Sequence, residues 1–251
     1  MRFLDKCVLV TGAGAGIGQA AALKFAAEGA KVVCNSISNS AQSTVEKILQ
    51  AGGEAIFAQG DVSSAEQAKS IVHSAIESYR KLDVLVNNAG IVYEGTLEST
   101  DEAAFRRTLE VNVIGTFLMS QCAASHMLLQ GYGAIVNTAS IAGLRGRTNR
   151  LAYASSKGAV IAMTKSLALE LASKNIRVNC VCPGTIITPS LEERIDRTEN
   201  PAAAYAEFCS RHPIGRLGMP EEIAEAILFA ACNEAAFMTG STIVIDGGSG
   251  I

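Results

Sequence analysis

The stretch TGAGAGIG, residues 11–18, follows the apolar run KCVLV and precedes the helical pattern QAAALKFAAEGAKVV. A strand, a glycine-rich turn and a helix in this order let a diphosphate approach the free N–H groups of the first helical turn. The spacing is G-x-x-x-G-x-G, and a tight turn between a strand and a helix needs glycine for its backbone geometry alone. We predict a turn that also contacts a dinucleotide, at Gly12, Gly16, Ile17 and Gly18.

Short apolar runs alternate with longer helical patterns along the rest of the chain. The runs predict strands over 6–11, 30–35, 54–59, 82–88, 133–140, 176–184 and 241–248, and helices over 18–28, 41–50, 65–79, 102–129, 152–173 and 221–232. Strands that are apolar throughout are typical of a parallel sheet with both faces covered. The predicted fold class is α/β, a single-domain doubly wound Rossmann fold over residues 1–251, with a seven-stranded parallel sheet flanked by helices. Segment 184–220, charged and weak in periodicity, predicts a mobile substrate lid.

Composition excludes several classes of function. The 251 residues are 49% hydrophobic with a formal net charge of −3, so no basic field favours nucleic acid as a partner. No run of 18 apolar residues predicts a membrane span, and the N-terminus MRFLDKCVLVTG has no secretory pattern, which favours a cytoplasmic location. The seven cysteines lack CxxC spacing, so packing is favoured over metal binding or a disulfide.

Four motifs in one order resemble the short-chain dehydrogenase/reductase family. They are TGAGAGIG, NNAG at 87–90, a serine at 140 placed thirteen residues before YASSK at 153–157, and CPGTIITP at 182–189. The resemblance implies a nicotinamide dinucleotide, a homotetramer and a catalytic set of Asn112, Ser140, Tyr153 and Lys157.

The chemistry of this set follows from its spacing. Tyr153 and Lys157 are four residues apart on a predicted helix, so both side chains project from one face. A phenol with a pKa of ~10 is a poor base at neutral pH, and we expect a nearby ammonium to lower that pKa. Tyr153 can then exchange a proton with an alcohol or a carbonyl while hydride moves to or from the cofactor. Ser140 would orient the substrate oxygen, and the resemblance implies that Asn112 interrupts its helix and holds a water linked to Lys157.

The resemblance also assigns further contacts with the cofactor. It implies adenine contacts at Asp61 and Val62, ribose contacts at Asn88, Ala89 and Gly90, carboxamide contacts at Pro183, Gly184, Ile186 and Thr188, and cofactor contacts for Tyr153 and Lys157 themselves. Asn87 is predicted to be structural, bonding backbone between strands.

The end of the second predicted strand bears on the choice of cofactor. NAD enzymes of this type usually place an acidic residue there, but no Asp or Glu occurs between Gly29 and Glu46. The basic residue that often accompanies NADP in the glycine loop is also missing, since Ala15 stands there. Asn35, Ser36 and Ser38 can bond to either cofactor. We favour NADP and leave NAD open.

Arginines indicate the class of substrate. The guanidinium fork suits a carboxylate, and the pattern from PGTIITPSLEERI to a later arginine resembles the branch with type 2 hydroxybutyrate dehydrogenase and keto-deoxy-sugar-acid dehydrogenases. That resemblance implies substrate contacts at Arg150, Arg194 and Arg211, beside Ser140. The expected substrate is a small hydroxy or keto acid or a sugar acid. A 3-oxoacyl-[acyl-carrier-protein] reductase and a non-catalytic dinucleotide sensor stay open as alternatives.

Overall fold

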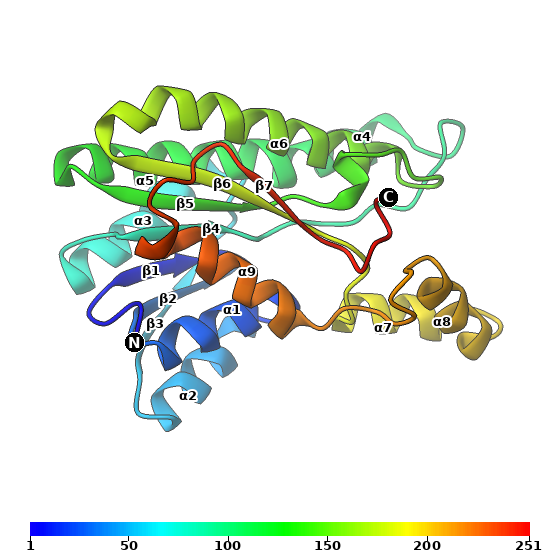
Figure 1. Cartoon of the computed structure of the whole chain (residues 1–251), viewed down its shortest axis with the longest axis horizontal. Coiled ribbons are helices and arrows are strands. Elements are labelled where there is room, and N and C mark those ends of the chain that lie inside the picture. Colours follow the sequence, from blue (N-terminus) through cyan, green and yellow to red (C-terminus); the bar gives the residue numbers. More distant parts are fainter.

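Seven parallel strands form one sheet in the computed structural model, which describes residues 1–251. The strands lie in the order β3-β2-β1-β4-β5-β6-β7, as Figure 1 shows. Their bounds are β1 Cys7–Val10, β2 Lys31–Ser36, β3 Glu54–Gln59, β4 Val84–Asn87, β5 Gly133–Thr138, β6 Ile176–Pro183 and β7 Thr242–Ile245. Six of the seven lie within the predicted apolar runs and β2 extends one residue beyond its run, to Ser36, so the predicted doubly wound Rossmann fold is confirmed.

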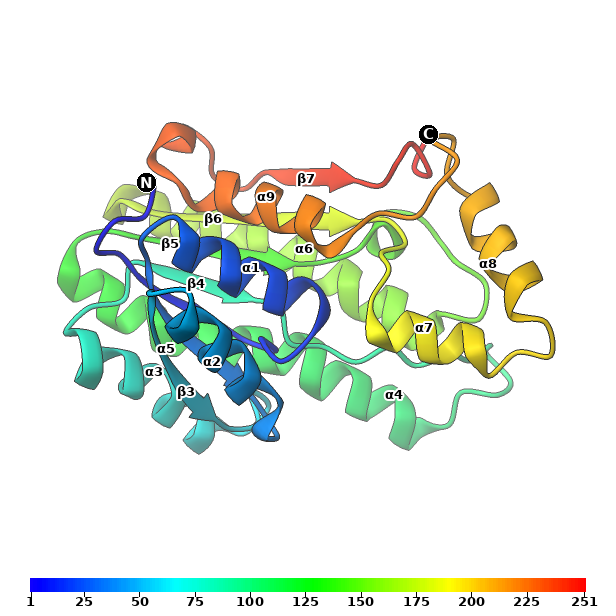
Figure 2. The same cartoon turned by 90° about the horizontal axis from the view of Figure 1, so that it is seen from below.

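Helices cover both faces of the sheet (Figures 1 and 2). One face carries α1 Gly16–Ala27, α2 Gln42–Gln50 and α9 Pro220–Ala231, and the other carries α3 Ala65–Tyr79, α5 Gly115–Gln130 and α6 Leu151–Leu171. The side chains of β1 alternate between the two layers: Val8 and Val10 pack toward α1 and α9, whereas Cys7 and Leu9 pack toward α3 and α5. Two apolar cores thus explain the continuous apolar strands. No helix combines the length and the apolar character that crossing a membrane requires.

The long helix predicted over 102–129 is interrupted in the structure. Helix α4 covers Glu102–Leu109, a π-helical turn covers Glu110–Ile114, and α5 begins at Gly115. Asn112 lies inside the π turn, where its side chain bonds to the main chain of Ile91 rather than to solvent. The helix is therefore interrupted at Asn112 as predicted, and the interruption is a π-helical turn, which contains one residue more than an α-helical turn.

The segment 184–220 is more regular than its weak periodicity predicts. It contains α7 Pro189–Asp196 and α8 Pro201–Ser210, which extend past the carboxyl ends of the strands in Figures 1 and 2. Thr188 and Asn200 cap these helices, and each is followed by proline in the first helical turn. A cap followed by proline is a recognised helix start, so both helices had a sequence signal that periodicity alone misses.

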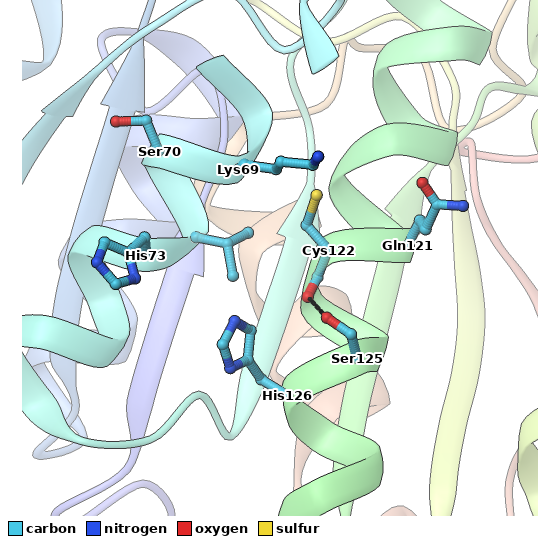
Figure 3. A pocket seen from close by; sticks show the side chains of 8 residues that line it. Lys69, Ser70, His73, Gln121, Cys122, Ser125 and His126 are labelled. Atoms are coloured by element: carbon cyan, nitrogen blue, oxygen red, sulfur yellow. Dashed lines mark hydrogen bonds between the residues drawn. The ribbon is translucent and has the colours of Figure 1, made fainter. Parts of the chain in front are cut away.

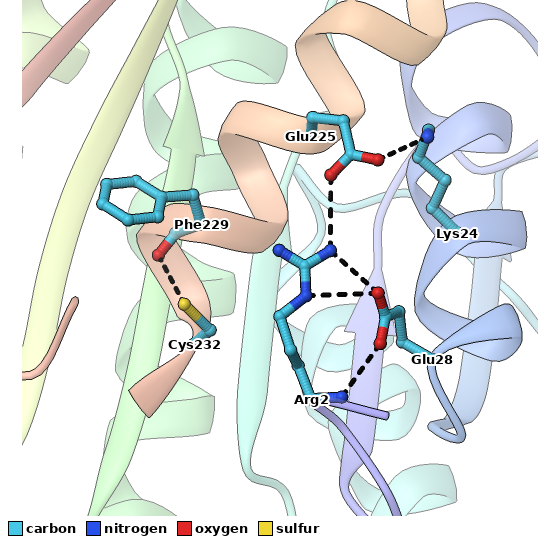
Figure 4. Close-up of polar contacts among 6 residues, drawn as sticks. All are labelled: Arg2, Lys24, Glu28, Glu225, Phe229 and Cys232. Carbon is cyan, nitrogen blue, oxygen red and sulfur yellow. Dashed lines mark hydrogen bonds and ion pairs between the residues drawn. The ribbon is translucent and has the colours of Figure 1, made fainter. Parts of the chain in front are cut away.

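An ion-pair network joins the N-terminus to α1 and α9 (Figure 4). Arg2 Nη2 lies 2.9 Å from Glu28 Oε1 and 3.3 Å from Glu225 Oε2, and Lys24 Nζ lies 2.6 Å from Glu225 Oε1. These carboxylates lie at the surface, where such pairs contribute little to stability. The network places the first residues of the chain beside α1 and α9, and α1 is the helix that follows the glycine turn.

Candidate active site

The candidate residues gather where parallel strands end. The glycine turn follows β1, Asn88 follows β4, Ser140 follows β5, and Pro183 ends β6. Since β1 lies between β2 and β4, the strand order reverses beside the glycine turn. A crevice at such a reversal is where doubly wound sheets bind their ligands.

The glycine turn forms an uncapped helix N-terminus. Gly12 and Gly16 have positive φ values of +63° and +56°. The residue before α1 is Ala15, which has no side chain to cap the first N–H groups, whereas α3, α4, α7 and α8 each have a capping side chain. An uncapped N-terminus lined by glycine fits a diphosphate, which supplies the missing acceptors.

Replacing Gly18 with alanine is expected to lower the free energy of unfolding by about 1–3 kcal/mol and to abolish nucleotide binding. An added Cβ at this position would lie 2.2 Å from the Gly12 carbonyl oxygen and 2.4 Å from Asn88 Nδ2, so the turn must move. Urea denaturation and titration of cofactor fluorescence measure the two effects. Gly146→Ala is the control, because its Cβ would enter open space. Normal nucleotide affinity in the Gly18 variant would contradict the assignment of the turn.

Thr11 connects the glycine turn to the NNAG motif. Its Oγ1 accepts hydrogen bonds from the N–H groups of Asn88 at 2.9 Å and Ala89 at 3.0 Å. Asn88 Nδ2 donates to the carbonyl oxygens of Thr11 at 3.1 Å and Gly12 at 3.3 Å. The sequence analysis did not assign Thr11, although its place at the end of β1 beside the glycines was a signal.

Asn87 is structural but not in the predicted way. Its Nδ2 donates to Ser120 Oγ and to Asn137 Oδ1, both at 2.9 Å, rather than bonding to backbone. Both partners are buried side chains, on α5 and β5. The prediction of backbone bonding was therefore wrong, because side chains accept the protons of the Asn87 amide nitrogen, while its buried Oδ1 has no hydrogen-bond partner in the protein.

Asn112, Tyr153 and Lys157 lie together on the π turn and α6. Asn112 Nδ2 donates to Ser156 Oγ at 2.9 Å, and Ser156 Oγ donates to the carbonyl oxygen of Tyr153 at 2.7 Å. Lys157 Nζ donates to the carbonyl oxygen of Thr138 at 2.7 Å and lies 5.7 Å from the centroid of the Tyr153 ring. The spacing of four residues thus does bring phenol and ammonium together.

Ser140 and Gly90 complete this cluster. Ser140 is buried after β5, and its Oγ accepts a hydrogen bond from Ala142 N at 3.1 Å, which leaves the hydroxyl proton free to donate. A Cβ added to Gly90 would lie 3.1 Å from Asn112 Oδ1 and 3.5 Å from Lys157 Nζ, so glycine keeps the space beside the lysine open. The buried Thr138 Oγ1 has no hydrogen-bond partner in the protein and lies on the residue that binds Lys157.

The charges of this cluster differ from the expectation. Burial raises the pKa of the Tyr153 phenol above its usual value, while Ser140, Arg150 and Arg194 act to lower it. Burial also lowers the pKa of Lys157 to about 8. Lys157 is not among the groups that lower the phenol pKa here, because its Nζ points to the Thr138 carbonyl oxygen and desolvation dominates, so the effect of Lys157 on the phenol stays a prediction.

The residues assigned to the adenosine side have partners within the protein. Asn35 Nδ2 donates to the carbonyl oxygens of Ala58 at 2.9 Å and Gly60 at 3.1 Å, and Ser36 Oγ donates to the carbonyl oxygen of Ser38 at 2.5 Å. Both side chains are buried at the end of β2. Asn35 and Ser36 thus have no free side-chain donor for the cofactor contacts expected of them, whereas the nearby Ser38 is exposed.

Asp61 follows β3, and its carboxylate is also occupied. It accepts hydrogen bonds from Ser63 N at 2.9 Å and from Arg107 Nη2 at 3.0 Å. These contacts, with that of the Ser63 hydroxyl, lower the pKa of Asp61 against the opposing effect of burial. Val62 is buried against Gly115 at the start of α5.

The PGTIIT segment leads from β6 into α7. Pro183 and Ile186 are buried, and Ile186 pairs with Gly218 in a short bridge. Gly184 lies so close to Asp246 that an added Cβ would be 2.8 Å from its Cα. Thr188 caps α7 and contacts the glycine turn, since a Cβ on Gly16 would lie 3.0 Å from Thr188 Cγ2. Segment 184–220 thus begins directly beside the glycine turn.

Two of the three assigned arginines meet at a single carboxylate. Arg150 Nη2 and Arg194 Nε lie 2.5 Å and 2.9 Å from Glu94 Oε1. Arg211 instead pairs with Glu207 at 2.5 Å and stacks on Phe208 with 4.6 Å between the guanidinium carbon and the ring centroid. Glu94, four residues after Gly90, was missed because a lone acidic residue in a loop carries no pattern.

One pocket lies away from these residues. A hollow of about 550 Å³ opens between α3 and α5 on the outer face (Figure 3). Most of its lining residues are polar, and Lys69 and His73 from α3 lie toward Cys122 and His126 from α5. None of the candidate catalytic residues lines it, so the crevice at the carboxyl ends remains the candidate active site.

Known proteins share this arrangement. The family profile described as Enoyl-(Acyl carrier protein) reductase matches residues 12–250. An uncharacterized oxidoreductase of Thermotoga maritima is 51% identical over 250 residues, covering 99% of each chain. The 3-oxoacyl-[acyl-carrier-protein] reductase FabG of Thermotoga maritima is 41% identical over 249 residues, again covering 99% of each chain.

A solved structure agrees. The crystal structure of levodione reductase superposes with a TM-score of 0.96 at 34% identity, covering 99% of this chain and 98% of that chain. The full-length matches and the site described above lead to one conclusion. The chain belongs to the short-chain dehydrogenase/reductase family and is an NAD(P)-dependent oxidoreductase that interconverts an alcohol and a ketone.

Proposed function

We propose that this enzyme interconverts a secondary alcohol and a ketone on a small hydroxy or keto acid or sugar acid, as in the branch with type 2 hydroxybutyrate dehydrogenase. One observation carries the proposal: Arg150 and Arg194 converge on the carboxylate of Glu94, and both act electrostatically on Tyr153. A corner that already holds one carboxylate beside the phenol has the chemistry to bind another.

The proposed reaction uses the chain's own groups for every proton step. A nicotinamide cofactor bound at the glycine turn would supply the hydride chemistry in both directions. Tyr153 takes the proton of the substrate hydroxyl, or donates a proton to the carbonyl oxygen in reverse. Ser140 donates its free hydroxyl proton to the same substrate oxygen and holds it near the phenol.

Lys157 and Asn112 support that proton transfer. Lys157 can leave the Thr138 carbonyl oxygen to bind ribose hydroxyls, and its ammonium then stabilises the phenolate. Asn112 keeps the loop after β4 against α6 through Ile91 and Ser156, and we propose that a water beside it leads from Lys157 to solvent.

Apart from Asn35 and Ser36, whose side chains bond within the protein, the proposed cofactor contacts are those assigned from the sequence, with NADP favoured over NAD. The turn after β2 carries no carboxylate to repel a 2′-phosphate, and Ser38 is exposed there. We further propose one domain over 1–251, closure of 184–220 over the substrate, a homotetramer and a cytoplasmic location. Family resemblance supports these points.

Initial rates with NADH and NADPH over a panel of keto acids, sugar acids and their methyl esters test the proposal. We expect turnover of acids to exceed that of the matching esters by at least tenfold, because an ester loses a charge-assisted contact worth about 1.5–3 kcal/mol. Equal turnover of acid and ester would remove the arginine argument. NADPH is expected to give the higher rate.

A 3-oxoacyl-[acyl-carrier-protein] reductase is the second candidate, because a relative with that name is 41% identical over nearly the whole chain. An acidic carrier protein needs a basic docking face, and segment 126–135 contains no Lys or Arg. Turnover of acetoacetyl thioesters above that of acetoacetate would favour this candidate. Tight cofactor binding with no turnover of any carbonyl compound would favour a dinucleotide sensor.

A further inference from the structure

The carboxylate of Glu94 lies between two arginines from different parts of the fold. Arg150 ends the loop before α6, three residues ahead of Tyr153, and Arg194 lies on α7. Their side chains are 18% and 25% exposed, against 50% for Glu94, so the arginines are the more desolvated partners. The carboxylate therefore acts on charges that solvent screens only in part.

The main chain holds Glu94 in this place. The next residue, Gly95, donates its N–H to the carbonyl oxygen of Asn149 at 3.1 Å and accepts from Leu151 N at 3.4 Å. These bonds join the loop after β4 to the residues on both sides of Arg150. A Cβ on Gly95 would lie 2.5 Å from Thr100 Oγ1, so the loop needs glycine at this point. Glu94 is thus fixed beside Arg150 independently of its ion pair.

The contacts leave part of each guanidinium free. Glu94 Oε1 lies 2.9 Å from Arg194 Nε as an ion pair, but the buried Nε has no hydrogen-bond partner in the protein, and no side-chain hydrogen bond engages the terminal nitrogens of Arg194. Arg150 donates Nη1 to the carbonyl oxygen of Asn149 at 2.8 Å and gives Nη2 to Glu94. A second carboxylate can therefore bind the terminal nitrogens of Arg194 while Glu94 stays in place.

The charge of this corner follows from its members. Arg150 and Arg194 contribute two positive charges and Glu94 one negative charge, which leaves a net charge of one positive unit. Arg211 also acts on Arg194, but it has its own counter-ion in Glu207. Without Glu94, the corner would hold two uncompensated guanidinium groups.

We propose that Glu94 is a specificity-determining residue that sets the net charge of the Arg150–Arg194 corner and so selects a substrate with one negative charge over a dianion. The inference rests on the proposed function, since it assumes that the corner binds the acid group of the substrate. A dianion there would place its second charge without a matching cation, next to the Glu94 carboxylate. Like charges at such a distance repel each other.

Binding of butyrate and glutarate to the enzyme with saturating oxidised cofactor tests the proposal. These probes carry one and two carboxylates, and titration calorimetry gives their affinities without any turnover. In Glu94→Gln, which keeps an oxygen for the arginines but removes the charge, we expect butyrate affinity to rise about threefold and glutarate affinity about tenfold. Glu98→Gln, an exposed residue of the same loop without an ion pair, should match the wild type.

The ratio of the two affinities decides between roles. An unchanged ratio in Glu94→Gln would overturn the proposal, as would a loss of affinity for both probes, which would make Glu94 only a support for the arginines. Failure of both probes to bind the wild type would also overturn it. The comparison of acids with esters in the wild type tests the proposed function separately, since it involves no change at Glu94.

Discussion

Tyr153→Phe is expected to lower kcat by about 10²–10⁴-fold, because it removes the group that exchanges a proton with the substrate oxygen. The ring fills the same space, and the carbonyl oxygen of Tyr153 keeps its bond from Ser156, so the fold should not change. Cofactor affinity should change little, since the phenol hydroxyl contributes at most a hydrogen bond of about 1 kcal/mol. Stopped-flow measurement of hydride transfer and fluorescence titration of NADPH separate the two effects.

Tyr132→Phe is the matched control for that variant. Tyr132 directly precedes β5, at the end of the sheet opposite to the candidate site, and its hydroxyl interacts with Asp83. Loss of the Tyr132 hydroxyl should leave kcat unchanged. A Tyr153→Phe enzyme that keeps more than about a tenth of the wild-type rate would contradict the proton-transfer assignment and would favour a water or Ser140 as the acid.

Much of the fold was predictable because the sheet is covered on both faces. Each strand must then be apolar at every position, as Val8, Leu9 and Val10 show, and such runs stand out in a sequence. The helices α7 and α8 were missed because few of their residues face a core. Only Leu191 and Ile195 of α7, and no residue of α8, are buried. Their signals are local caps rather than periodicity.

The candidate site was predictable in its membership but not in its electrostatics. Motif spacing indicates that Tyr153 and Lys157 face one crevice, because four residues on a helix fix their relative direction. Spacing carries no information on burial or on which acceptor a flexible lysine chooses. The bond from Lys157 to the Thr138 carbonyl oxygen and the pairing of Glu94 with two arginines depend on loops that the fold brings together.

Lys157→Met is expected to lower kcat by about 10²-fold or more while making the cofactor-free protein more stable. The loss of turnover follows from removal of the cation that stabilises the phenolate. The gain in stability arises because Lys157 is only 5% exposed and has no ion pair. Its pKa is lowered from 10.5 to about 8, and this shift corresponds to about 3 kcal/mol of destabilisation of the wild type at neutral pH. Loss of the bond to the Thr138 carbonyl oxygen offsets about 1 kcal/mol, leaving a net gain of about 2 kcal/mol.

The pH dependence of that gain identifies its cause. Below pH 8 the lysine is protonated in the folded and unfolded states alike, so the full penalty is present in the wild type. Between about pH 8 and 10.5 the unfolded state binds the proton and the folded state does not, so wild-type stability rises with pH relative to the variant. The free energy of unfolding of Lys157→Met should therefore exceed that of the wild type by a margin that shrinks as the pH rises, which urea denaturation at pH 7, 8.5 and 10 measures. Lys165 is exposed on the same helix, so Lys165→Met should show neither the gain in stability nor its dependence on pH. A difference that stays constant from pH 7 to pH 10 would mean that Lys157 keeps its proton, with its charge better satisfied than a single carbonyl oxygen allows.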